Sequence, residues 1–160
     1  MNTYNIAIAG LGGQGIIKAS DIVADAAFRA GYDVKKAEVH GMSQRGGSVT
    51  TDIRFGPEVL SPMTPDGEVD MLVLTDATQE PVNRHRLRPD GHVIGPDALA
   101  EVALPNRKTL NVALLGLLSA HLPLPADAWQ AAIRHALPQK VHAINLEAFE
   151  LGRQTAQPHG

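Results

Sequence analysis

The chain has 160 residues, 44% of them hydrophobic and 19% charged, with a formal net charge of −3 at pH 7; this is the size and composition of one globular domain with its own core. The mildly acidic balance argues against a nucleic-acid-binding surface, and the absence of cysteine excludes disulfides, a cysteine nucleophile and cysteine-held iron–sulfur clusters within this chain. No apolar run reaches the roughly 18 residues of a membrane-spanning helix and the N-terminus leads into a predicted strand without a signal peptide, so we expect a cytoplasmic protein that binds neither membrane nor nucleic acid.

The chain opens on an apolar run followed by a glycine-rich turn. Residues 6–9 are apolar and end at a glycine, which predicts a buried parallel strand. The next residues fit the pattern G-x-G-x-x-G, and a helix with one apolar stripe follows, with Gly31 placed to end it. A turn between a strand and a helix N-terminus can present backbone amides to an anion. The candidate cofactor-binding residues are therefore Gly10, Gly12, Gly13, Gln14 and Gly15. The alternative is that these glycines only let the helix pack closely against the strand.

Two further strands are predicted on either side of a second glycine-rich segment. Residues 33–39 read as a strand, and residues 48–55 alternate between apolar and polar, which is typical of a half-exposed antiparallel strand. Between them, residues 40–47 have neither a helical nor a strand period and contain three glycines and an arginine. The guanidinium of Arg45 beside bare backbone suits a carboxylate or a phosphate. The alternative is that Arg45 pairs with a neighbouring subunit or with Asp76.

The rest of the chain adds one buried strand and several helices. Residues 71–74 are a buried strand that ends at Thr75 and Asp76, where a parallel sheet exposes its carboxyl edge. We expect a helix over 79–86 ended by the turn 88–91, a short strand over 92–94, and helices over 111–120, 126–137 and 145–151, with Gly116 allowing a close helix approach. This order predicts an α/β fold: a single Rossmann-like domain with a mostly parallel sheet, an antiparallel insertion after the second strand, and helices on both faces. The domain covers residues 1–152, and residues 153–160 form a flexible tail.

Few of the usual catalytic or cofactor patterns fit the sequence. A dinucleotide site needs an acid near the end of the second strand to hold the ribose, and Asp33 and Glu38 are both poorly placed for this. No G-K-[ST] lysine follows the glycine turn, and the seven histidines lack metal-ligand spacing. Ser43 has no base held by an acid nearby in the sequence. We therefore expect no catalytic residue and no metal site in this chain.

Two motifs together resemble a known family. The first is Gly10-Leu-Gly-Gly-Gln-Gly15, and the second, more specific one is Glu38-Val-His-Gly-Met-Ser-Gln-Arg-Gly-Gly-Ser-Val49. They resemble the gamma-type subunit of 2-oxoacid:ferredoxin (acceptor) oxidoreductases, and within that family the small (beta) subunit of indolepyruvate oxidoreductase. The stretches Asn111–Gly116 and Asn145–Gly152 are similar to the family as well, so the resemblance covers nearly the whole chain. The chain is short for the indolepyruvate type, which leaves the exact substrate open.

The resemblance implies a non-catalytic subunit of a larger enzyme. Such enzymes oxidatively decarboxylate a 2-oxoacid, here an aryl-pyruvate such as indolepyruvate, to an acyl-coenzyme A and pass the electrons to ferredoxin or another acceptor. Thiamine diphosphate, Mg²⁺ and [4Fe-4S] clusters are expected on large partner subunits, and coenzyme A is a co-substrate. The loop that faces the substrate, coenzyme A or the partner is then formed by His40, Met42, Ser43, Gln44, Arg45, Gly46 and Gly47. Two other classes stay open: a stand-alone nucleotide-binding Rossmann-like oxidoreductase domain and a purely structural assembly subunit.

Overall fold

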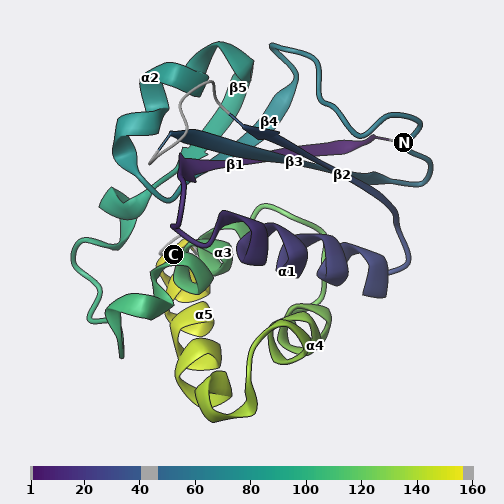
Figure 1. Cartoon of the computed structure of the whole chain (residues 1–160). Helices are drawn as coiled ribbons and strands as arrows, with labels where there is room; N and C mark the ends of the chain where they lie inside the picture. The colour runs from purple at the N-terminus through teal and green to yellow at the C-terminus, as the bar shows by residue number, and fades with distance from the viewer. Residues whose placement is uncertain (1, 41–46, 157–160) are drawn as a thin grey trace.

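A computed structural model of the chain describes residues 2–40 and 47–156 (Figure 1). Its five strands form one sheet in the order β2-β3-β1-β4-β5. The strands are β1 (Tyr4–Leu11), β2 (Asp33–His40), β3 (Ser48–Gly56), β4 (Val69–Leu74) and β5 (Leu87–Ile94).

One strand runs against the other four. β1 pairs in parallel with β4, and β4 in parallel with β5. β3 lies antiparallel to both β1 and β2, so β2 points the same way as β1, β4 and β5. The predicted α/β fold, with a mostly parallel sheet and an antiparallel insertion after the second strand, is confirmed. The insertion also separates β2 from β1 by one strand.

The long helices cover one face of the sheet. These are α1 (Ile16–Arg29), α3 (Leu110–Ser119), α4 (Ala126–Ala136) and α5 (His142–Ala156), which lie below the sheet in Figure 1. The opposite face carries a short helical segment made of η1 (Ala77–Gln79), α2 (Glu80–Asn83) and η2 (Arg84–Arg86). Three further 3-10 turns are η3 (Pro96–Leu99), η4 (Arg107–Thr109) and η5 (Gln139–Val141). Within the described residues no helix is both long enough and apolar enough to cross a membrane.

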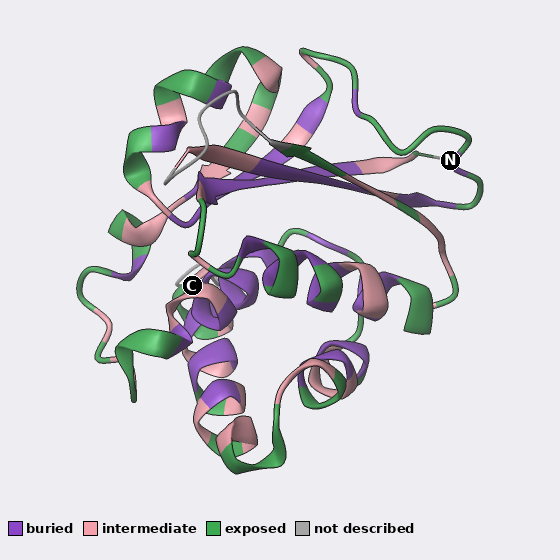
Figure 2. Ribbon diagram, in the orientation of Figure 1, coloured by how far each residue is buried: buried purple, intermediate pink, exposed green. Residues whose placement is uncertain are grey.

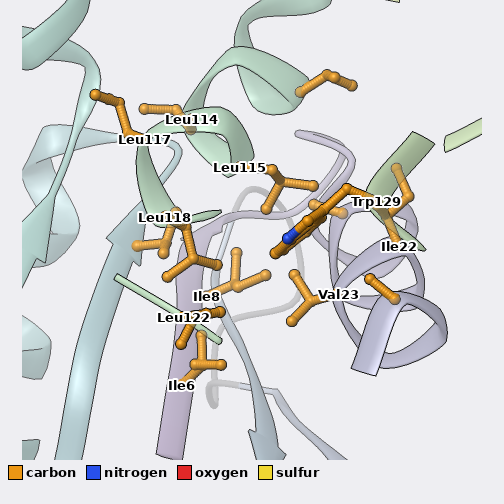
Figure 3. Packing of buried hydrophobic residues seen from close by; sticks show 14 of the residues in the cluster. Ile6, Ile8, Ile22, Val23, Leu114, Leu115, Leu117, Leu118, Leu122 and Trp129 are labelled. Atoms are coloured by element: carbon orange, nitrogen blue, oxygen red, sulfur yellow. The ribbon is translucent and has the colours of Figure 1, made fainter. Parts of the chain in front are cut away.

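The main core lies between the sheet and the long helices (Figure 2). Ile6 and Ile8 point from β1 toward the helices and are fully buried. Leucines of α3 and Trp129 of α4 fill the same space (Figure 3). A smaller cluster forms on the other face, where Ala7 and Ala9 of β1 meet residues of β4. Because both faces of β1 are covered, its sequence is a continuous apolar run rather than an alternating one.

Two glycines allow α3 and α5 to cross at close range. A Cβ added at Gly116 would lie inside the contact distance of the Phe149 carbonyl oxygen, and one added at Gly152 would collide with the carbonyl of Ala113. Neither position leaves room for a side chain, because the atoms in the way belong to the backbone. The close approach expected at Gly116 therefore occurs, and α5 supplies the second glycine.

β3 differs from its predicted half-exposed state. Thr50 and Asp52, on the face expected to be exposed, are buried. Asp52 is fully buried because Arg86 binds it with two hydrogen bonds of 2.8 Å and the amide of Thr64 donates a third of 3.1 Å. An alternating pattern predicts that these polar residues face solvent. Here the ion pair with Arg86 of η2 covers Asp52, and the hydroxyl of Thr50 donates to Asn83 of α2 at 3.4 Å.

The second half of the chain also differs in its element boundaries. The helix expected over 79–86 is divided into three short turns, η1, α2 and η2. The turn expected over 88–91 lies within β5, as a bulge between the pairs Val69–Leu87 and Met71–His92. The last helix, α5, runs over His142–Ala156 and so extends into residues that the sequence assigned to the tail; residues 157–160 lie outside the described part.

Replacing Gly116 with alanine tests the helix crossing. We expect Gly116→Ala to lower the free energy of unfolding by about 1–3 kcal/mol or more, because overpacking against backbone cannot be relieved by a rotamer change. Gly95→Ala is the matched control, since its Cβ would meet Leu74 at an ordinary 3.8 Å and its φ is −139°. Urea unfolding followed by circular dichroism measures both; an equal, small effect of the two substitutions would contradict the close crossing.

Candidate functional site

The candidate site lies at the carboxyl edge of the sheet. The carboxyl ends of β1, β2, β4 and β5 meet there with the start of β3, because β3 alone runs in reverse. The amide of Gly12 donates a hydrogen bond of 3.0 Å to the carbonyl oxygen of Gly47. The glycine turn after β1 is thus joined to the residue that precedes β3. Ligands of open α/β sheets bind at edges of this kind.

Much of the second glycine-rich segment lies outside the described residues. Met42, Ser43, Gln44, Arg45 and Gly46 are in this part, so the arrangement predicted for their side chains stays a prediction. The backbone of His40 ends β2 opposite Val49. Gly47 is described and contacts Gly12. Both ends of the segment therefore belong to the carboxyl edge.

The side chain of Gln14 fills the glycine turn. Its Oε1 atom accepts hydrogen bonds from the amide of Leu11 at 2.7 Å and from the hydroxyl of Thr75 at 3.0 Å. Its Nε2 atom donates to Asp76 Oδ2 at 2.9 Å. The backbone carbonyl of Gln14 accepts from the side-chain amide of Asn111 at 2.6 Å. One residue thereby connects the end of β1, the end of β4 and the start of α3.

The glycines of the turn make room for this arrangement. A Cβ at Gly10 would collide with the hydroxyl of Thr75 and crowd Gln14. Gly15 precedes α1 with φ of +78°, and Gly13 has φ of +86°, a region that favours glycine. The requirement for glycine at these positions is therefore explained by close packing and by backbone conformation, with no ligand needed.

Polar side chains form the rim beside this turn. Asp76 accepts hydrogen bonds from the hydroxyl and the amide of Thr78, which cap η1. The hydroxyl of Thr78, then Gln14, then the Thr78 amide lower the pKa of Asp76, so it stays ionised at neutral pH. Across the edge, Ser48 donates to Gln79 Oε1 at 2.6 Å. The described rim thus holds a carboxylate and several neutral hydrogen-bonding groups.

The geometry does not fit a dinucleotide. Three amides that would face a pyrophosphate are used within the protein, since Leu11 donates to Gln14 Oε1, Gly12 to Gly47 and Gln14 to the Leu11 carbonyl. Strands in a sheet are about 4.8 Å apart. With β3 inserted, the end of β2 is two such spacings from β1, so an acid there is displaced from the ribose position. The carboxylate of Asp33 lies at the opposite end of β2 and accepts from the Val59 amide at 2.8 Å.

Several site residues were not singled out by their sequence. Ser48, Gln79 and Asn111 line or brace the edge. Ser48 lies within the second motif and Asn111 begins a stretch similar to the family, but neither was assigned a role in the site, and Gln79 is an isolated polar residue in its segment. Asn111 carries a weak signal, because it is a polar residue at the start of an otherwise apolar helix. Thr75 and Asp76 were expected at this edge, and they are there. Among the described residues no cluster of three His, Asp or Glu side chains could hold a metal ion.

Comparison with known sequences identifies the family. A profile of the pyruvate ferredoxin/flavodoxin oxidoreductase family matches residues 5–105 and 96–155, nearly the whole chain. The chain belongs to this family. It is 32% identical over 197 aligned residues to the indolepyruvate oxidoreductase subunit IorB of Thermococcus kodakarensis, and the match covers 98% of each chain. That alignment is longer than the 160 residues of this chain, so the relative carries insertions.

Solved structures share the fold. The pyruvate oxidoreductase subunit PORC of Thermotoga maritima superposes with a TM-score of 0.76 at 23% identity, covering 96% of this chain and 97% of that one. A 2-oxoglutarate:ferredoxin oxidoreductase from Magnetococcus marinus, with 2-oxoglutarate, coenzyme A and succinyl-CoA bound, gives a TM-score of 0.80 at 21% identity. The match covers 98% of this chain and 31% of that longer one. The whole of this chain thus corresponds in fold to one part of a larger polypeptide.

Truncating Gln14 tests its role in the edge. We expect Gln14→Ala to lower the free energy of unfolding by about 1–3 kcal/mol, because the Leu11 amide and the Thr75 hydroxyl lose their acceptor. Gln154→Ala is the control, since Gln154 is exposed on α5. Urea titrations of the two variants and the wild type give the values. If the Gln14→Ala variant is as stable as the Gln154→Ala variant, the hydrogen bonds of Gln14 do not stabilise the fold.

Titration of the purified chain with NAD(H) tests whether the side chain of Gln14 keeps a dinucleotide out of the glycine turn. We expect no binding tighter than about 10 μM, roughly −7 kcal/mol, because the amides of Leu11, Gly12 and Gln14 are engaged and β2 lies one strand too far away. Isothermal titration calorimetry is the measurement. A dissociation constant well below that value would favour the stand-alone dehydrogenase alternative.

Proposed function

We propose that this chain is the small, non-catalytic subunit of a thiamine-diphosphate-dependent 2-oxoacid oxidoreductase that acts on an aryl-pyruvate such as indolepyruvate. The observation that carries the proposal is the end-to-end match with the indolepyruvate oxidoreductase subunit, which spans 98% of each chain. The complex would work in the cytoplasm. It would pass its electrons to ferredoxin or another acceptor.

The chemistry of the reaction explains why partner subunits are needed. A 2-oxoacid and the thiol of coenzyme A give an acyl-coenzyme A thioester, carbon dioxide, one proton and two electrons. Thiamine diphosphate supplies the electron sink for decarboxylation, and iron–sulfur clusters carry the electrons away. This chain has no cysteine to hold a cluster. The proposal therefore assigns thiamine diphosphate, Mg²⁺ and [4Fe-4S] clusters to large partner subunits, with coenzyme A as co-substrate.

The carboxyl edge is the part of this chain that we assign to the reaction. Gly12 to Gly15 belong to it, and so do the two described ends of the second glycine-rich segment, His40 and Gly47. In the complex this edge would face the path of the oxoacid or coenzyme A, with Arg45 meeting an anionic group there or an acidic residue of the partner. The glycine turn itself is braced by Gln14. The contact with a ligand is thus assigned to the Arg45 segment rather than to the turn.

Co-expression with the large subunit tests the assembly. The purified chain alone should contain no stoichiometric iron or thiamine and show no oxoacid-dependent dye reduction. Together with the large subunit it should form a stable complex, whose interface would bury roughly 2,000 Å² or more, as obligate interfaces do. If the chain stays monomeric beside its co-expressed partner, the proposal is wrong. If the complex forms but the large subunit alone has the same activity as the complex, this chain is a purely structural subunit.

The substitution Arg45→Ala tests the assigned segment. We expect it to lower turnover or raise the Michaelis constant of the complex by about tenfold or more, since losing one partner of a buried charged pair costs roughly 2–5 kcal/mol. Arg45→Lys should restore the activity only in part, because an ammonium cannot form a bidentate contact. Arg134→Ala, at an exposed position on α4, is the control.

Size-exclusion chromatography run beside the kinetics separates two roles of Arg45. Reduced activity with intact assembly supports a role in ligand binding. Lost assembly with normal activity per assembled complex would make Arg45 an interface residue. Wild-type kinetics with intact assembly would exclude Arg45 from the site.

A further inference from the structure

A cavity lies on the helical side of the molecule, and its lining includes Gly15 of the glycine turn and Asn111, which binds the Gln14 carbonyl. It has a volume of about 390 Å³ and opens between the first turns of α1, the start of α3 and the residues that lead into α5. Its buried wall is apolar and includes Ile22, Val112 and Leu115. Its exposed lining residues are small, polar or charged: Gly15, Lys18, Asn106 and Lys108. The pocket thus has an apolar floor and a polar mouth, as binding sites for small organic molecules commonly have.

The charged groups at the mouth are of one sign. Lys18 and Lys108 line the pocket, and its lining contains no aspartate or glutamate. Each lining asparagine makes one hydrogen bond within the protein: Asn106 Oδ1 caps η4, Asn111 donates to the Gln14 carbonyl and Asn145 donates to the Val141 carbonyl. The ammonium of Lys18 donates one hydrogen bond of 3.2 Å to the Ala136 carbonyl oxygen and keeps two further N–H groups. Because the described lining contains no other charged side chain than Lys18 and Lys108, these two ammonium groups are best placed to fix a ligand, and they favour an anion.

The volume limits the size of the occupant. A water molecule takes up about 30 Å³ in the liquid, so the cavity corresponds to roughly a dozen waters or a similar number of non-hydrogen atoms. We propose that this pocket binds a hydrophobic carboxylate of roughly that size, an aryl or medium-chain aliphatic acid, with the carboxylate at the two lysines and the apolar body against Ile22, Val112 and Leu115. This site does not depend on the proposed oxidoreductase function, because residues of this chain alone form the pocket.

The single tryptophan offers a local reporter. Trp129 is the one tryptophan of the chain and is 1% exposed. It lies beside Leu115 and Ile22, two residues of the pocket wall (Figure 3). Filling the pocket changes the surroundings of the indole through these two side chains. A bound acid should therefore change the fluorescence of Trp129 at the same concentrations at which calorimetry detects binding.

Decanoate, 1-naphthaleneacetate and the neutral decan-1-ol are the probes, titrated into the full-length chain by calorimetry and fluorescence. We expect at least one of the two carboxylates to bind with a dissociation constant of about 100 μM or lower, and decan-1-ol to bind about tenfold more weakly than decanoate. Binding of decanoate alone identifies an aliphatic acid site, and binding of 1-naphthaleneacetate alone an aryl acid site. Failure of both carboxylates to bind at about 1 mM would overturn the proposal.

Two sets of variants locate the site. The double substitution Lys18→Ala and Lys108→Ala should weaken carboxylate binding about tenfold or more, while Lys140→Ala, an exposed lysine outside the lining, should not. Ile144 is a half-buried residue of the pocket wall. The substitution Ile144→Phe should weaken the binding of all three probes, because the larger side chain fills part of the pocket. Thermal unfolding checks that each variant is folded. Unchanged carboxylate binding in the double lysine variant, or in a folded Ile144→Phe variant, would place the ligand elsewhere and contradict the proposal.

Discussion

The side chain of Gln14 is the contact on which the carboxyl edge of this sheet depends. Its amide oxygen and nitrogen together bind the end of β1, the hydroxyl that follows β4 and the carboxylate of Asp76. The oxygen accepts the Leu11 amide, and backbone carbonyls accept the amides of Gly12 and Gln14, so these three groups have partners within the protein. Gly10 is glycine since a Cβ there would collide with Thr75, the hydroxyl that Gln14 binds. A motif associated with phosphate binding thus has a structural role in this chain.

The position of β3 sets a second constraint on function. A dinucleotide-binding sheet keeps its second strand beside the first, so that the acid at its end reaches the ribose held near the glycine turn. Here an antiparallel strand occupies that place, and the end of β2 lies on its far side. The same insertion brings the residue before β3 against the glycine turn, through the bond between Gly12 and Gly47. The topology that removes the dinucleotide geometry therefore also joins the two glycine-rich segments at one edge.

The sequence predicted the first half of the chain well because its signals are local. The apolar run before Gly10, the amphipathic pattern of α1 and Gly31 at its end each depend on neighbouring residues, and all three are found in the structure. The failures concern contacts between distant residues. The alternating pattern predicts a solvent-facing Asp52, because its partner Arg86 lies 34 residues further along the chain. Proline and glycine lie close together at the bulge in β5 and therefore predict a turn, whereas the register with β4 shows that the segment is part of a strand. The motif containing Gln14 was found, but its role depends on Thr75 and Asp76, whose position beside it requires β4 to pair with β1.

Reconstitution of activity tests the account most directly. The large subunit, purified with and without this chain, is supplied with indolepyruvate, coenzyme A and ferredoxin, and the reduction of ferredoxin is followed. The account predicts reduction that requires the oxoacid and coenzyme A and that falls to background when this chain is left out, with no reduction by this chain alone. Full activity of the large subunit without it, or NAD-dependent turnover by the isolated chain, would contradict the account.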